Sequence, residues 1–82
     1  MFFSAIARIS HLISKMITLQ INGADQRVER GSSIQKLLEH LKLVGKKIAV
    51  ERNGELVPRS DYASCQLSEG DKLEIVVAVG GG

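Results

Sequence analysis

Three consecutive glycines, Gly80, Gly81 and Gly82, end the 82-residue sequence and carry its clearest chemical signal. Glycine has no Cβ, so such a segment is thin enough to enter a narrow channel with the carboxylate of Gly82 leading. A carboxylate is a poor electrophile, and acyl chemistry there needs activation, for which an acyl-adenylate made from ATP by another protein is the natural route. Displacement of AMP by a persulfide then leaves sulfur on the terminus. An unstructured chain end is the alternative interpretation of the same residues.

Few other side chains offer chemistry. Cys65 is the only cysteine, so no internal disulfide is possible and a reducing cytosol suits the chain. No histidine or basic cluster precedes Cys65, which favours a half-buried structural thiol. His11 and His40 are too isolated to form a metal-ligand set, so we expect neither a metal nor another bound cofactor.

Length and charge limit the class of protein. Eighty-two residues make one small domain, too small for a deep catalytic pocket, so we expect a partner of enzymes and not an enzyme. Of eleven basic side chains, Arg8 and Lys15 lie in the first 15 residues, which leaves nine against nine acidic ones in residues 16–82. An electrically neutral body with few aromatic residues argues against nucleic-acid binding.

Residues 1–15 form an amphipathic stretch before the main pattern begins. Its length is below the roughly 20 apolar residues that cross a bilayer, so no membrane insertion is expected. It also lacks the features of a secretory signal. An organellar transit peptide is one interpretation of this stretch. We favour the alternative that Met16 is the natural start and that residues 1–15 are a disordered arm or a gene-start artefact. We therefore expect a cytoplasmic protein that is monomeric when free.

The pattern from Met16 onward predicts a hairpin and a helix. Strict alternation in residues 17–21 predicts a strand, and Asn22-Gly23 predicts a turn into a second strand over residues 26–29. Ser32 and Gln35 match a capping box. The helix that follows presents Ile34, Leu37, Leu38 and Leu41 on one face, and Gly45 is expected to end it in a left-handed conformation.

Three further strands follow the helix. Residues 48–52 and 55–57 flank an Asn53-Gly54 turn, and Pro58 stops the second of them. Residues 72–79 are predicted to form the last strand. A first and a last strand separated by one helix pair in parallel at the sheet centre. The sequence therefore predicts an α+β fold, the β-grasp or ubiquitin-like roll, as a domain over residues 16–79 with a reactive tail at 80–82.

Several surface residues are candidates for partner binding. Val76 and Ala78 fall on the sheet face opposite the core, close to the tail, where they predict an apolar docking patch. Arg52, Glu55 and Arg59 lie in or near the NGELVPR segment, either as solvated turn charges or as contacts to a partner. Of these we select Arg59 as the candidate contact.

Residues 16–82 resemble the ThiS family of sulfur carrier proteins of thiamine biosynthesis. The resemblance rests on MITLQINGADQRV, SSIQKLLEHL, AVERNGELVPRSDY and GDKLEIVVAVGGG. It implies that a ThiF-type adenylyltransferase activates Gly82 with ATP and that a cysteine desulfurase or another donor supplies sulfur, giving a C-terminal 1-thioglycine. It also implies transfer to ThiG, the thiazole synthase, where the sulfur attacks 1-deoxy-D-xylulose 5-phosphate held as an imine on a lysine. The extension before Met16 departs from the family pattern.

Three other classes share parts of this pattern. The small subunit of molybdopterin synthase has the same fold and thiocarboxylate, but its connection after the helix is usually longer than LKLVG. A ubiquitin-like protein modifier would use the same activation and then form an isopeptide bond. A passive β-grasp ligand-binding module would be expected to continue past Gly82.

Overall fold

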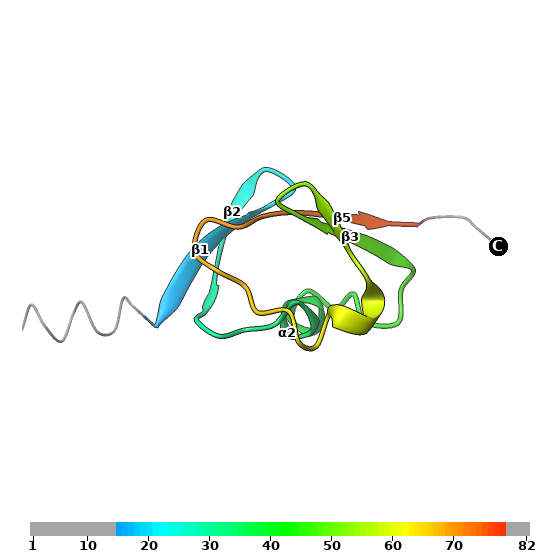
Figure 1. Cartoon of the computed structure of the whole chain (residues 1–82), viewed down its shortest axis with the longest axis horizontal. Coiled ribbons are helices and arrows are strands. Elements are labelled where there is room, and N and C mark those ends of the chain that lie inside the picture. Colours follow the sequence, from blue (N-terminus) through cyan, green and yellow to red (C-terminus); the bar gives the residue numbers. More distant parts are fainter. Residues whose placement is uncertain (1–14, 79–82) are drawn as a thin grey trace, which may run out of the picture.

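The computed structural model describes residues 15–78, which form a five-stranded sheet with helix α2 packed on one face (Figure 1). The elements are β1 (Met16–Ile21), β2 (Ala24–Glu29), α2 (Ile34–His40), β3 (Ile48–Arg52), β4 (Glu55–Val57), a 3-10 turn η1 (Arg59–Asp61) and β5 (Lys72–Val77). The strand order is β2-β1-β5-β3-β4, with β1 and β5 parallel and the other pairs antiparallel. The predicted β-grasp fold is confirmed.

The first hairpin follows the predicted alternation. Ile17 and Leu19 are each 1% exposed, and Val28 meets Ile17 across the strand pair. Asn22 and Gly23 have φ values of 52° and 86°, and two positive φ values are what a two-residue hairpin turn with the right twist requires. The return strand begins at Ala24, two residues before the predicted start.

One hydrophobic core lies between the helix and the sheet. Its buried side chains are Ile17, Leu19, Val28, Ile34, Leu37, Leu38, Val50, Tyr62, Leu67, Leu73 and Ile75. The helix contributes the predicted i, i+3, i+4 set, and the strands contribute alternate residues, since successive strand side chains point to opposite faces. The other face of the sheet is left to solvent or to partners.

The helix begins one residue later than the capping box predicted. Ser33, not Ser32, is the N-cap, and its Oγ accepts a hydrogen bond from the Lys36 N–H at 3.1 Å. The backbone of Ser32 is engaged elsewhere, because its N–H donates to the Glu29 carbonyl and its C=O accepts from Leu67. These bonds close the loop before the helix and leave the capping position to Ser33.

The helix also ends earlier than predicted. Lys42, with φ 60°, takes the left-handed position after the C-cap, whereas Gly45 lies three residues further along the loop. The Leu43 N–H donates to the Leu38 carbonyl at 2.9 Å and the Lys42 N–H to the Glu39 carbonyl at 3.1 Å, which is the Schellman pattern. Leu43 packs against the core, and the chain has to turn at Lys42 to place it there.

The last strand was predicted over residues 72–79 and is formed over Lys72–Val77. The Ala78 N–H still donates to the Lys47 carbonyl at 2.8 Å, so β5 stays attached to the chain beside β3 up to that point. Val79, the tail at 80–82 and most of the extension, residues 1–14, lie outside the described residues. The domain limits assigned to them remain predictions.

We predict that Lys42→Gly stabilises the protein by about 0.5–1 kcal/mol. Glycine adopts a left-handed conformation without the steric cost that lysine has there, but the greater conformational entropy of glycine in the unfolded chain offsets part of this stabilisation. Urea unfolding measures the change. Lys46→Gly is the matched control: this exposed lysine lies nearby outside the left-handed region, and its replacement should give no gain. Equal effects of the two substitutions would contradict the assignment.

Candidate functional site

Strand β5 is the last strand before the terminal glycines in the sequence, and we call this strand, Lys72–Val77, the tail mount. It lies at the sheet centre and runs toward the end of the sheet away from Met16 (Figure 1). Five residue pairs join β5 to β3, from Arg52↔Leu73 to Ile48↔Val77. Only two pairs, Gln20↔Lys72 and Ile21↔Leu73, join it to β1. The pairing with β1 is therefore short, and other bonds have to hold this side of β5.

The side chain of Asn22 continues the pairing where β1 ends. Its Oδ1 accepts from the Ile75 N–H at 2.8 Å, and its Nδ2 donates to the Ile75 carbonyl at 3.1 Å. Its own N–H donates to the Leu73 carbonyl at 2.9 Å. The Asn22 carboxamide thus makes with Ile75 the two hydrogen bonds that a further peptide group of β1 would otherwise make. Beyond Ile75, β5 is paired with β3 alone.

Asn53 holds the beginning of β5 in the same way from the other side. Its Oδ1 accepts from the Lys72 N–H at 2.9 Å, and its own N–H donates to the Lys72 carbonyl at 2.7 Å. Its Nδ2 donates to Asp71 Oδ1 at 3.1 Å. Both asparagines of the two Asn-Gly turns therefore hold β5, a role that turn propensity alone did not predict.

Asp71 is the one buried charged side chain among residues 15–78. Burial alone would raise its pKa, but hydrogen bonds from the Ser68 N–H, Asn53 and Arg52, with the Arg52 charge, lower the pKa below its ordinary value. Arg52 Nε and Nη2 both lie 2.9 Å from Asp71 Oδ2. Arg52 is thus an internal ion-pair partner, a role that the sequence did not reveal, and its contact with a partner remains a prediction.

Cys65 is half-buried, as predicted. Arg52 Nη1 lies 3.2 Å from its Sγ, a basic neighbour that the sequence did not reveal because the two residues are 13 positions apart. The same guanidinium reaches Ser68 Oγ at 3.4 Å. The thiol therefore belongs to a polar cluster, formed by Arg52, Cys65, Ser68 and Asp71, that lies next to the start of β5.

The predicted docking residues lie on the open sheet face. Val76 is 62% exposed, Ala78 is exposed, and Ala49 of β3 lies opposite Val76. Leu56 of β4, which the sequence did not single out, is 68% exposed on the same face. Their predicted exposure is confirmed, and their contact with a partner remains a prediction.

Arg59 begins η1 and is exposed. It lines a shallow groove with Lys46, Lys47 and Ile48, and Ile48 pairs with Val77 at the end of β5. The fold therefore brings Arg59 and two lysines close to the end of the last strand. Its role as a partner contact is not decided by this placement.

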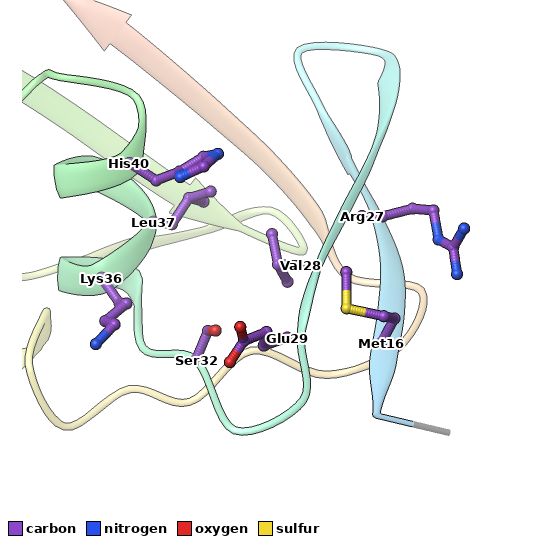
Figure 2. Close-up of a pocket in the computed structure, with 8 residues that line it drawn as sticks. All are labelled: Met16, Arg27, Val28, Glu29, Ser32, Lys36, Leu37 and His40. Atoms are coloured by element: carbon purple, nitrogen blue, oxygen red, sulfur yellow. The ribbon is translucent and has the colours of Figure 1, made fainter. Parts of the chain in front are cut away.

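A second cavity lies between β2 and α2, lined by Met16, Arg27, Val28, Glu29, Ser32, Lys36, Leu37 and His40 (Figure 2). Val28 and Leu37 point toward each other across it, whereas Arg27 points away from the helix. Met16 starts β1, so this cavity is at the end of the sheet away from the last residues of β5. It is not part of the tail mount.

Residues 15–78 contain neither a metal-binding cluster nor a membrane-spanning helix. No group of three or more histidine, cysteine or acidic side chains is arranged to hold a metal ion. No helix in this part of the chain is long and apolar enough to cross a membrane.

The fold, with its central last strand followed by glycines, defines a ubiquitin-like β-grasp protein. The model of the ThiS family matches residues 19–82, and the chain belongs to that family. It is 40% identical over 65 residues to the sulfur carrier protein ThiS of Bacillus subtilis, which covers 78% of this chain and 98% of that protein.

Two more comparisons support the assignment. The chain is 45% identical over 64 residues to a thiazole synthase of Paramagnetospirillum magneticum, with 78% of this chain matched, but it spans only 20% of that protein's length. The crystal structure of a thiamine biosynthesis protein (ThiS) from Geobacter metallireducens superposes with a TM-score of 0.69 at 29% identity, covering 80% of this chain and all of the other.

We predict that Asn22→Gly destabilises the domain by about 1–3 kcal/mol. Glycine keeps the left-handed turn but leaves the Ile75 N–H and C=O without the carboxamide. The melting temperature should fall by roughly 4–8 °C per kcal/mol. Asn22→Asp keeps the acceptor for the Ile75 N–H and should be intermediate. Unchanged stability in Asn22→Gly would show that the carboxamide does not hold β5.

Acid should selectively weaken the Asp71 cluster. Because the pKa of Asp71 is lower in the folded protein, the folded state binds fewer protons, and stability falls as the pH drops below 3.8, the ordinary value. Asp71→Asn should be less stable than the parent at neutral pH, and the difference should shrink in acid. Urea unfolding from neutral to acidic pH measures both. A difference independent of pH would contradict the assigned ion pair.

Proposed function

We propose that this chain is a sulfur carrier for formation of the thiazole ring of thiamine, with Gly82 as the attachment point. The observation that carries the proposal is the family match, which runs through the glycines to residue 82. The names of the Bacillus subtilis relative and of the thiazole synthase relatives agree with it. The central, doubly held β5 gives such a tail a rigid base.

Loading would take place in three steps. A ThiF-type adenylyltransferase joins the Gly82 carboxylate to the α-phosphate of ATP and releases pyrophosphate. A persulfide sulfur, derived from a cysteine desulfurase or another donor, attacks the acyl carbon and displaces AMP. A thiol then cleaves the resulting acyl disulfide by exchange and leaves 1-thioglycine at Gly82. The chain itself is a co-substrate of these enzymes and binds no cofactor.

Delivery would use ThiG, the thiazole synthase, as the acceptor. The thiocarboxylate sulfur attacks the imine that the synthase forms with 1-deoxy-D-xylulose 5-phosphate and bonds to the substrate carbon. The bond between this sulfur and the Gly82 acyl carbon then breaks as the acyl group is transferred to an oxygen of the substrate or of water, so the carrier is recovered with its carboxylate. Gly80 and Gly81 pass the channel because they have no side chains. Val76 and Ala78 contact the partner beside the tail, and Arg59 contacts it from the groove. We propose that the carrier works in the cytoplasm together with these enzymes.

The test is the intact mass of the chain purified from cells that also produce the adenylyltransferase and a cysteine desulfurase. We expect a gain equal to replacement of one oxygen by sulfur, mapped to the C-terminal peptide. Deletion of Gly82, or addition of one residue after it, should abolish the gain and leave the melting temperature unchanged, because the core of the described domain is formed by side chains within residues 17–75.

Two results would contradict the proposal. An unchanged mass in the presence of active partners would remove the carrier role. Sulfur loading of the variant without Gly82 would remove Gly82 as the attachment point. An isopeptide bond between Gly82 and lysines of other proteins would instead assign the chain as a protein modifier.

A further inference from the structure

Two glutamates lie directly opposite each other on the open face of the sheet. Glu51 of β3 pairs in register with Glu74 of β5, and both are exposed. The next pair along these strands, Val50 and Ile75, is buried under the helix, so the two carboxylates point to the opposite face. Side chains in such a pair have Cβ atoms roughly 5 Å apart.

This arrangement works against the fold. Like charges directly opposite each other destabilise a sheet. Within residues 15–78 neither carboxylate has an ion-pair or hydrogen-bond partner. Lys72 is on the same face two residues before Glu74, yet it forms no ion pair with either glutamate. The repulsion is therefore left uncompensated in the free domain.

Apolar side chains flank the acidic pair. Leu56 lies opposite Glu51 on β4, and Val76 follows Glu74 by one strand repeat, opposite Ala49. Leu56 and Val76 are the most exposed large hydrophobic residues of the sheet, at 68% and 62%. Exposed apolar residues around charged groups are typical of a protein-binding surface. The patch also reaches the last residues of β5.

We propose that Glu51 and Glu74, framed by Leu56 and Val76, form a docking site for a partner protein that presents arginine or lysine among apolar side chains. A cation placed between the carboxylates turns their repulsion into two attractions and removes the cost that the free domain carries. Charge complementarity selects a basic partner, because the exposed face carries two unpaired carboxylates at the centre of the patch.

The opposite side of the end of β5 has the opposite charge. Lys46, Lys47 and Arg59 line the groove there, next to the chain that pairs with the last residues of β5. A partner that binds around the last residues of β5 therefore contacts acidic side chains on the open sheet face and basic side chains on the helix side. The two charges fix its orientation around the tail. The inference rests on the proposed function, since the partner is the enzyme that acts on Gly82.

Stability measurements test the repulsion first. Glu51→Gln and Glu74→Gln should each raise the melting temperature by about 1–5 °C, and the double variant should gain little more than either one, because a single substitution already removes the pair. Glu39→Gln, on the outer face of α2, makes the same change in net charge and should have no such effect. Additive gains, or none, would contradict the repulsive pair.

Docking is tested with the cognate adenylyltransferase, by measuring the KM for the carrier in ATP–pyrophosphate exchange. Each of the two variants should raise KM by about 3- to 10-fold and lessen its dependence on salt, whereas Glu39→Gln should match the parent. Variants that are more stable but bind less well show that the pair serves the partner and not the fold.

Other outcomes separate the possible failures. A parent chain that is not adenylated overturns the proposed function and, with it, this inference. A parent chain that is adenylated, with variants of unchanged KM, overturns the inference alone. Sedimentation that reveals a dimer of the parent chain, disrupted by either variant, assigns the face to a second copy and also overturns it.

Discussion

The two hydrogen bonds between the Asn22 carboxamide and the Ile75 backbone determine whether β5 can serve as a mount. Strand β1 pairs with β5 over only two residues, and the carboxamide continues this contact one step further. Ile75 and Leu73 thereby stay in register under the helix, where both are buried. The same register places Glu74 and Val76 on the outer face. The Asn22 carboxamide and the five residue pairs with β3 thus together hold the register on which the core and the docking face depend.

The elements of the fold were predictable because they follow from local patterns. Period-two alternation located β1 and β5, and the spacing of Ile34, Leu37 and Leu38 located the helix. The ends of the helix were predicted less well, because they depend on distant contacts. Ser32 is held by Leu67, which frees Ser33 to cap, and Leu43 packs into the core, which forces Lys42 into the left-handed region.

The site was only partly predictable, for a related reason. Exposure of Val76 and Ala78 follows from strand parity once Leu73 and Ile75 are assigned to the core. The roles of Asn22, Asn53 and Arg52 do not, because each acts on a residue that is far away in the sequence. The pairing of Glu51 with Glu74 requires the register of β3 against β5, which no local pattern contains.

Stability and recognition make different demands on the two faces of the sheet. Just before β5, the buried charge of Asp71 is compensated by Arg52 and by hydrogen bonds, as a buried charge requires. On the outer face, Glu51 and Glu74 are not compensated within residues 15–78, although a single glutamine at either position would relieve them. The proposed basic partner would supply the compensation that this acidic pair lacks within the described domain. Because Val76 links this face to the end of β5, a basic partner bound there lies beside the last residues of that strand.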